Sequence, residues 1–250
     1  MKAIRSLFAL ALVLPLLPAA GRRAAGPADE IIAKARAYLG REDVLNSVRT
    51  VHYIGSFEDD THQKVGLDVV FVRPYRQLMV VTTPKTASAP GVREITVLDG
   101  YAGWREVQEI GGTGRGQITM LDVAPVKRLR ANVWENLYFY RDIGKKGGHV
   151  DYLGPASVDG HAAIKVAFVH DNGIVFTRYF DAQTGQRLLS ETESGGSIRE
   201  EGEIIAGGLH FPKKLTNVQN GKTVVITFDE VRVNESVPES VFALPGFYGN

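Results

Sequence analysis

The sequence predicts an α+β fold that is mostly β, a long antiparallel meander with one helix at its start and one near its middle. The hydrophobic period is helical over residues 28–40 and alternates by two from residue 49 onward, with one helical interruption at 124–141. Turn-forming pairs such as Asp159-Gly160 and Asn220-Gly221 separate the alternating segments, as in hairpins. A sheet with so many consecutive hairpins must curl or close to hide its edges. We therefore expect the helices to cover the apolar face of a curled sheet.

Residues 1–21 have the pattern of a secretory signal peptide. Two basic residues precede an apolar run at residues 7–17, which is too short to span a bilayer and is interrupted by Pro15. Cleavage is expected between residues 20 and 28. The remaining chain, residues 28–250, shows no linker, repeat or shift of composition, so we expect one domain that is soluble in the exported compartment, with no transmembrane segment.

Composition excludes several classes of protein. The chain has no cysteine, so neither a disulfide framework nor a lipid anchor on cysteine is expected. Lys and Arg number 29 against 28 Asp and Glu, whereas a nucleic-acid binder would carry a basic excess on one face. The basic run at residues 127–130 lies between Asp122 and Glu135 and is interpreted as a solvated face. No nucleic-acid partner is expected.

The first helix is expected within residues 28–40, with Asp29 as its N-terminal cap and Gly40 as its C-terminal stop. Its apolar stripe comprises Ile31, Ile32, Ala35 and Leu39. Residues 41–48 predict a second short helix or a turn. Strands are then expected at residues 50–59, 63–74, 75–84, 93–100 and 103–110, and, after the middle helix, at 149–158, 161–169, 174–182, 186–194, 197–207, 209–220 and 222–234.

The segment Glu109–Leu121, "EIGGTGRGQITML", has the glycine content of a phosphate-binding loop but lacks its context. Gly116 is followed by Gln117 rather than by Lys and Ser or Thr, and the third glycine of a dinucleotide fingerprint is missing. The residues that follow are β-branched and short rather than the start of a helix. The segment is therefore interpreted as a connection between two elements.

Several stretches resemble one known superfamily. They are "ADEIIAKARAYLGREDVLNSVRTVHYIGSF", "LDGYAGW", "DYLGPASVDGHAAIKVAF", "TRYFDAQTGQRLLSE" and the ending "GLHFPKKLTNVQNGKTVVITFDEVRVNESVPESVFALP". In this order they resemble the LolA/LolB-like periplasmic lipoprotein carriers, above all the outer membrane lipoprotein-sorting proteins. The resemblance implies a half-open antiparallel β-barrel around helices, an apolar cavity for acyl chains, and a place in a Gram-negative periplasm. The "GGTGRGQ" segment departs from the superfamily, which usually has a short helix there.

An apolar cavity also follows from the residues themselves. A concave sheet face lined by large apolar side chains binds hydrocarbon, because each buried methylene contributes about 0.8 kcal/mol. Met79 and Trp134 are favoured, since a thioether and a large aromatic ring adapt to chains of variable shape. Packing within the core is the alternative for each residue taken alone. The residues expected to line the cavity are Tyr53, Phe57, Val69, Phe71, Met79, Val81, Trp134, Leu137 and Tyr138.

No motif indicates an enzyme, a metal site or a cofactor. The sequence has neither G-x-S-x-G nor H-E-x-x-H, and its six histidines are scattered over separate strands and turns. His170 is expected at a solvated hairpin end, where His170-Asp171 could bind a metal only with ligands from a distant strand. The carboxylates of residues 199–203 are interpreted as a charged outer strand face. Trp104 is interpreted as closing a hairpin, and Arg105 as an exposed strand cation rather than a head-group contact.

Two hypotheses of different class remain, with an unusual hydrolase as a third. The first is a carrier that encloses acyl chains of a lipoprotein or lipid and exchanges them with a membrane-bound donor or acceptor protein. The second is a periplasmic sensor whose partner is a membrane-bound anti-sigma protein. A carrier retains lipid when it is purified, a sensor retains a protein partner, and a hydrolase shows turnover.

Overall fold

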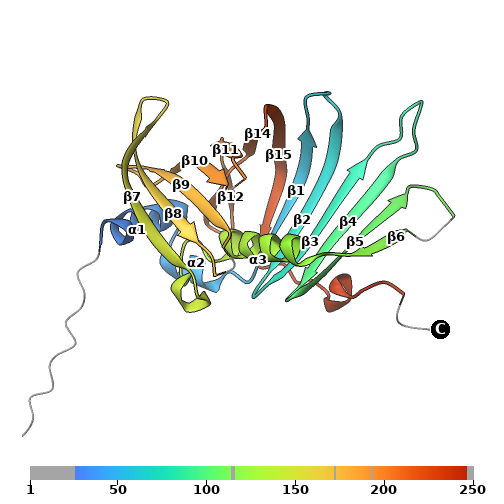
Figure 1. The fold of residues 1–250 in the computed structure, drawn as a ribbon, viewed down its shortest axis with the longest axis horizontal. Coiled ribbons are helices and arrows are strands. Elements are labelled where there is room, and N and C mark those ends of the chain that lie inside the picture. Colours follow the sequence, from blue (N-terminus) through green and yellow to red (C-terminus); the bar gives the residue numbers. More distant parts are fainter. Residues whose placement is uncertain (1–25, 114–115, 172, 193, 247–250) are drawn as a thin grey trace, which may run out of the picture.

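The computed structural model describes residues 26–246 except 114–115, 172 and 193, so the predicted signal peptide lies outside the described residues. One antiparallel sheet of 13 strands dominates the molecule, and its strands fan across the whole of Figure 1. Its order is β6-β5-β4-β3-β2-β1-β15-β14-β11-β10-β9-β8-β7, and a separate hairpin is formed by β12 and β13. The predicted class, a mostly-β fold with a curled and open sheet, is confirmed.

The elements follow one another along the chain in the predicted sequence of helix, meander, helix and meander. The helical segments are α1 (Pro27–Leu39), α2 (Glu42–Ser47), α3 (Val123–Leu137), η1 (Gly144–Lys146) and η2 (Glu239–Phe242). The strands before α3 are β1 (Thr50–Glu58), β2 (Lys64–Val72), β3 (Arg76–Thr83), β4 (Val92–Asp99), β5 (Ala102–Glu109) and β6 (Gln117–Met120). The strands after it are β7 (His149–Val158), β8 (His161–Val169), β9 (Val175–Asp181), β10 (Arg187–Thr192), β11 (Ser197–Glu201), β12 (Ile204–Ala206), β13 (Leu209–Phe211), β14 (Lys214–Gln219) and β15 (Lys222–Val233).

The order of the strands explains why α3 lies inside the curl. The first strand, β1, pairs with the last, β15, so the two meanders grow outward from this central pair. The strands β6 and β7 are neighbours in the chain but occupy the two opposite edges of the sheet. The connection between them must therefore cross from one edge to the other, and Figure 1 shows α3 spanning the sheet on this path.

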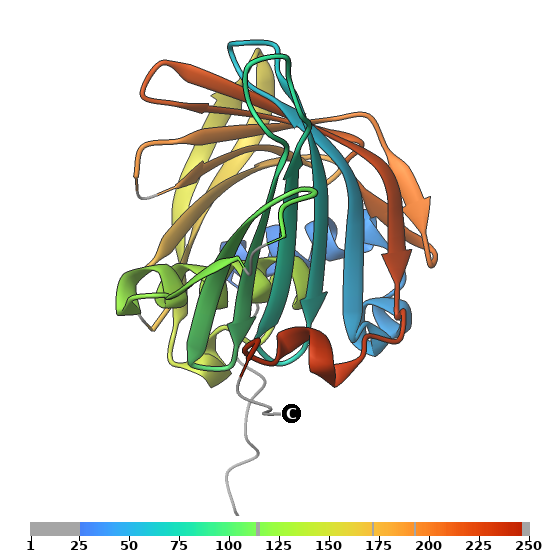
Figure 2. The same cartoon turned by 90° about the vertical axis from the view of Figure 1, so that its right-hand side faces the viewer.

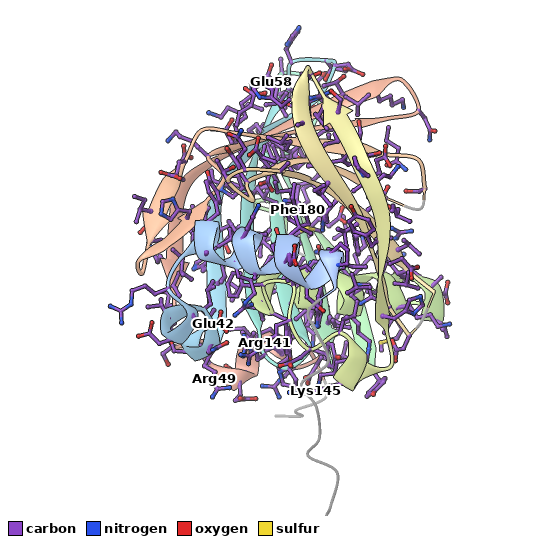
Figure 3. All side chains as sticks on the ribbon, turned by 90° about the vertical axis from the view of Figure 1, so that its left-hand side faces the viewer. Glu42, Arg49, Glu58, Arg141, Lys145 and Phe180 are labelled. Carbon is purple, nitrogen blue, oxygen red and sulfur yellow. The ribbon has the colours of Figure 1, made fainter. Side chains whose placement is uncertain are left out.

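Helix α1 covers the part of the sheet formed after α3. Ile31 and Ala35 are buried in one cluster with Trp134, Phe168 and Phe180, and Figure 3 shows α1 running across this side of the molecule. The turn between β9 and β10 touches the helix directly, because a Cβ on Gly185 would lie 2.4 Å from the backbone carbon of Lys34. The approach requires a glycine, which also adopts φ +77° there.

Arg36 of α1 joins three segments. Its guanidinium contacts both carboxylate oxygens of Glu42 in α2, with nitrogen–oxygen distances of 3.0 and 2.9 Å. It also donates hydrogen bonds to the backbone carbonyls of Tyr138 and Phe139, which follow α3. Glu42 lies 3.5 Å from Arg141, and both are labelled in Figure 3. Arg36 thus satisfies carbonyls at the C-terminal end of α3 that have no partner within the helix.

The C-terminal segment covers the outer face of the first meander. Phe242 is buried against Val97 and Trp104, and Val237, Val241 and Leu244 pack around them. The indole nitrogen of Trp104 lies 3.4 Å from the carbonyl oxygen of Phe242. Figure 2 shows η2 lying across the lower ends of the strands. The sequence predicts that Trp104 closes a hairpin, whereas in the structure it holds the C-terminal segment against the face opposite the concave interior.

Three predicted boundaries need correction. The middle helix ends at Leu137 rather than at residue 141, because Phe139, Tyr140 and Asp142 have positive φ values that an α-helix does not allow. Gly26 is the N-terminal cap of α1, while Asp29 accepts a hydrogen bond from its backbone N–H.

The third correction concerns residues 197–220, where two predicted strands are four. Gly202, with φ +64°, separates β11 from β12, and Pro212, which has no backbone N–H, separates β13 from β14. The intervening hairpin leaves the main sheet and bridges α1 through Gly40 and Leu209.

Candidate functional site

The concave interior contains an apolar compartment of about 540 Å³. Inward-facing side chains of β1, β2, β3, β14 and β15 form its wall, and α3 contributes Asn132 and Asn136. Its apolar lining comprises Tyr53, Phe57, Leu67, Val69, Phe71, Met79, Val81, Leu215, Val224, Ile226 and Phe228. Neither the volume nor the lining is unusual for a small-ligand site, which is concave and mostly apolar with a few polar groups.

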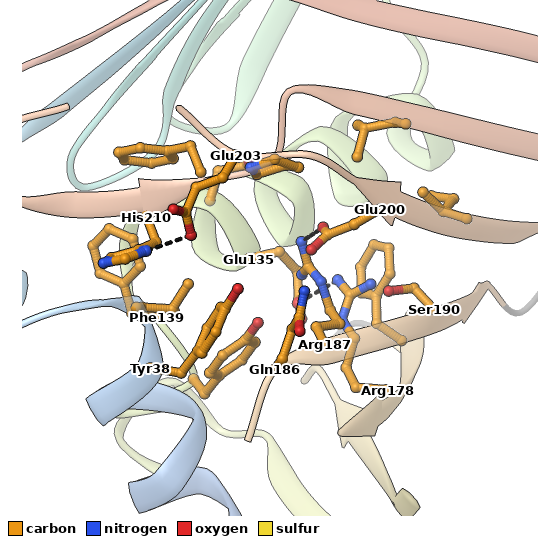
Figure 4. Close-up of a pocket in the computed structure, with 18 of the residues that line it drawn as sticks. Tyr38, Glu135, Phe139, Arg178, Gln186, Arg187, Ser190, Glu200, Glu203 and His210 are labelled. Carbon is orange, nitrogen blue, oxygen red and sulfur yellow. Dashed lines mark hydrogen bonds and ion pairs between the residues drawn. The ribbon is translucent and has the colours of Figure 1, made fainter. Parts of the chain in front are cut away.

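A smaller polar compartment of about 180 Å³ adjoins the apolar compartment. Figure 4 shows Tyr38 of α1, Glu135 of α3, Arg178 of β9 and Arg187 of β10 converging on it. Arg187 and Glu200 line both compartments and thus mark the boundary between them. The two compartments together form one amphipathic cavity.

The innermost part of the polar compartment is a buried charge cluster centred on Glu135. Its two carboxylate oxygens lie 3.0 Å from Nε2 of His170 and 2.6 Å from Nη2 of Arg178. All three side chains are at least nine-tenths buried. Burial alone would raise the pKa of Glu135, but Arg178 and His170 outweigh it and hold that pKa below its usual range. The cluster connects α3 to β9 and to His170, which directly follows β8. Removing any one of its members would deprive a buried charge of a partner.

The boundary between the compartments is an ion pair of Arg187 with Glu200, whose side chains are 21% and 15% exposed. Desolvation lowers the pKa of Arg187, with Tyr140, Glu135 and Tyr53 opposing this change. The Nε atom of Arg187 is buried and has no hydrogen-bond partner. This N–H is closed to a ligand, so a group bound where the two compartments meet would contact the other N–H groups of this side chain, which is 21% exposed.

The outer end of the polar compartment lies between α1 and the β12–β13 hairpin. Nδ1 of His210 lies 2.5 Å from Oε1 of Glu203, and both side chains are more than a third exposed. The ring of Tyr38 lies 5.7 Å from that of His210. Burial raises the pKa of Tyr38, so its hydroxyl stays protonated and can donate to a bound group.

The predicted lining residues separate into two groups. Six of them, from β1 to β3, line the apolar compartment: Tyr53, Phe57, Val69, Phe71, Met79 and Val81. The other three lie elsewhere. Trp134 packs against Phe168 and His170, Leu137 is buried in the core beneath the helix, and the ring of Tyr138 lies 4.6 Å from the guanidinium carbon of Arg73. The side of α3 that faces the cavity is instead polar, because Asn132 and Asn136 lie there.

Two expectations about polar residues are wrong. His170 is 8% exposed and packs against Trp134 rather than lying in solvent. Glu200 faces the cavity interior and pairs with Arg187, so it is not part of an outer charged face. Arg105, by contrast, is half-exposed and pairs with Glu94 on the neighbouring strand, as an exposed cation does. No group of metal ligands occurs around His170 or elsewhere in the part of the chain that the structure describes.

Sequence reasoning missed the charged residues of the cavity, but a signal was present for two of them. In β9, Arg178 lies in the same alternating phase as Phe176 and Phe180, which are buried. In β11, Glu200 shares its phase with Ile198, and both line the polar compartment. A charged residue in the inward phase of a strand indicates either a buried pair or a cavity.

Comparison with known proteins identifies the fold. No protein-family model and no curated protein matches the sequence. A DUF1329 family protein from Desulfovibrio piger matches with a TM-score of 0.56 and 9% identity, covering 88% of this chain and 98% of that one. A domain described as an outer membrane lipoprotein-sorting protein, from Vibrio parahaemolyticus, matches with a TM-score of 0.53 and 11% identity, covering 85% and 94%.

These likenesses establish the class of architecture. The chain shares the fold of these two solved structures, an antiparallel sheet curled into a half-open barrel, and the fold that the sequence resemblance implies is confirmed. Within the described residues, no helix is both long enough and apolar enough to cross a membrane.

Proposed function

We propose that the protein is a periplasmic carrier that binds acyl chains of a lipid or lipoprotein in the apolar compartment. The observation that carries the proposal is the open space of about 540 Å³ lined by apolar side chains from five strands. A folded core normally fills such space with its own side chains. An acyl chain in the compartment would gain about 0.8 kcal/mol for each methylene removed from water.

The architecture also supports a reversible mechanism. The sheet is open between β6 and β7, and α3 contacts the strands that line the compartment through buried Val126, Val133 and Leu137 as well as through polar side chains. Nδ2 of Asn132 lies 3.3 Å from Oε1 of Gln77, a single hydrogen bond between neutral groups. Displacement of this helix would widen the compartment for loading and unloading, but it would also break the apolar contacts of Val133 and Leu137 and strain the Glu135 cluster, so the ligand must compensate for these losses.

Native mass spectrometry of the mature protein, isolated from the periplasm without detergent, tests the proposal. The expected result is a mass excess that solvent extraction releases as an acylated species. A protein that is empty in repeated preparations, and that takes up no added lipid, would contradict the carrier. In that case crosslinking in the periplasm would test the sensor hypothesis, which requires a specific protein partner.

A further inference from the structure

The polar compartment has an excess of hydrogen-bond donors. Among the described residues, the buried side-chain atoms without a partner are Nε of Arg73, Arg178 and Arg187 and Nε1 of Trp134. Two of these four N–H groups, those of Arg178 and Arg187, belong to residues that line the compartment. These two N–H groups are buried, so a bound group would contact the remaining N–H groups of either guanidinium, and it would have to supply oxygen acceptors, because guanidinium groups donate and never accept.

The carboxylates around the compartment are already engaged. Glu135 is held by His170 and Arg178, and Glu203 by His210. Glu200 contacts Arg187, so one acidic side chain faces a guanidinium that has five N–H donors. The compartment therefore has more hydrogen-bond donors than acceptors. A bound acceptor could contact the guanidinium of Arg187 without displacing the partners of Glu135.

Of the two arginines, Arg187 is better placed to contact a bound oxygen acceptor. Arg178 is directed to Glu135, whereas Arg187 lines the apolar compartment as well as the polar one. On the apolar side it shares the lining with Leu67, Ile226 and Phe228, which do not line the polar compartment. A ligand that has a hydrocarbon tail and an oxygen-bearing end matches this arrangement along its length.

We infer that Arg187 binds the acyl oxygens of the ligand, either a free carboxylate or an ester carbonyl, while the hydrocarbon tail lies in the apolar compartment. The inference rests on the proposed function and gives the bound chain a direction. The tail extends toward Phe57, Val81 and Val224, and the oxygen end lies at Arg187. Any head group beyond an ester oxygen enters the polar compartment, toward Tyr38 and His210.

A comparison of three ligands with one chain length tests the assignment. Lauric acid, methyl laurate and dodecane are added to the delipidated mature protein, and displacement of the neutral apolar probe N-phenyl-1-naphthylamine is measured. Wild type is expected to prefer at least one of the oxygenated ligands to dodecane by about tenfold, the effect of a hydrogen bond to a charged group. A preference for the acid alone identifies a carboxylate, and a preference for the ester a carbonyl.

Arg187→Gln is expected to abolish this preference, so that the ratio of the affinity for an oxygenated ligand to that for dodecane, measured in the same variant, falls to about one. The matched control is Arg199→Gln, on the adjacent strand, where the arginine pairs with Asp159 and is half-exposed. Because Arg187→Gln deprives Glu200 of its partner and lowers stability, Glu200→Gln provides a second variant. It keeps the side-chain shape, leaves the guanidinium unneutralised, and should strengthen acid binding several-fold relative to dodecane.

The outcomes separate the inference from the proposed function. Equal affinities for all three ligands in wild type, or a preference that survives in folded Arg187→Gln, would overturn the role of Arg187 and leave the carrier intact. Failure of every ligand to displace the probe would contradict the carrier itself.

Discussion

The apolar and the polar compartments are neighbours in one cavity, yet they are built in opposite ways. The apolar compartment is a wall of side chains from β1–β3, β14 and β15 that contact one another mainly by apolar packing, with open space beside them. The polar compartment is a network in which Glu135 has two partners and Arg187 has one. A wall of the first kind tolerates changes of shape, whereas a buried network loses stability when one member is removed. The difference indicates that the apolar compartment can adapt to ligands of different shape, whereas the polar compartment fixes the position of the ligand.

Removal of the charge of Glu135 should have the largest effect. Glu135→Gln leaves Arg178 buried beside a neutral amide, and breaking such a buried pair costs about 3–5 kcal/mol. Urea unfolding followed by circular dichroism should show this loss in the free energy of unfolding. The matched control is Glu201→Gln, where the carboxylate pairs with exposed Lys214 and the expected loss is below about 1 kcal/mol. If Glu135→Gln and Glu201→Gln lower the free energy of unfolding equally, the polar compartment is not a network that depends on each of its members.

The same contrast explains how much could be predicted from the sequence. The strands of the first meander alternate clearly, so their inward residues, such as Tyr53 and Val69, could be assigned from the period alone. The residues Arg178 and Glu200 also lie in the inward phase of their strands, but a charge is ordinarily assigned to solvent. Their burial depends on partners that are distant in sequence, since Glu135 precedes Arg178 by 43 residues. Such pairings follow from the folded arrangement of α3 and cannot be derived from local pattern.

The middle helix shows a second limit of the sequence. The sequence predicts that Trp134, Leu137 and Tyr138 line the cavity, but Trp134 and Leu137 are buried in core clusters and Tyr138 is not part of the cavity lining. Trp134 belongs to the cluster with α1, and Leu137 to the cluster with β1 and β2. The side that faces the cavity holds Asn132 and Asn136. Because the path of α3 depends on which strands become the two sheet edges, the periodicity could not show which side of the helix faces the ligand.

The second prediction concerns a substitution that fills the apolar compartment. Val81→Trp places a large ring among the lining residues and should weaken binding of dodecane or methyl laurate by about tenfold or more, since the space for the tail is lost. Stability should change by less than about 3 kcal/mol, the usual cost of overpacking. The measurement is probe displacement together with urea unfolding.

Val80→Trp is the matched control, because Val80 is the preceding residue of β3 and is absent from the cavity lining. Successive strand residues point to opposite faces, so the control adds the same ring to the outer face. Its ligand affinity should equal that of wild type. If both variants bind like wild type while remaining folded, the apolar compartment is not the binding site.

The smallest expected effect concerns a charge cluster on the outer face. Like the Glu135 cluster, it pairs histidine with carboxylate, but its carboxylates are exposed to solvent. His52 of β1 lies 3.0 Å from Asp68 and 2.7 Å from Glu235, whose side chains are 45% and 37% exposed. The hydrogen bond to Asp68, opposed by burial and aided by Glu235, raises the pKa of His52 above its ordinary value. Arg232 also forms an ion pair with Glu235, so the carboxylate of Glu235 has two cationic partners when His52 is protonated.

A raised folded pKa fixes the direction of the pH effect. The stabilisation from His52 is fully present below the unfolded pKa of about 6.5 and is lost as pH rises through the higher folded value. The inner cluster behaves oppositely, because the lowered pKa of Glu135 makes its contribution present above the unfolded value and lost in acid. His52→Gln should therefore flatten the stability profile from about pH 6.5 upward, by less than about 1 kcal/mol, with no change in ligand affinity. Urea unfolding across this range, with exposed His62→Gln as the control, measures the slope, and an unchanged slope in His52→Gln would show that the outer cluster contributes no pH-dependent stability.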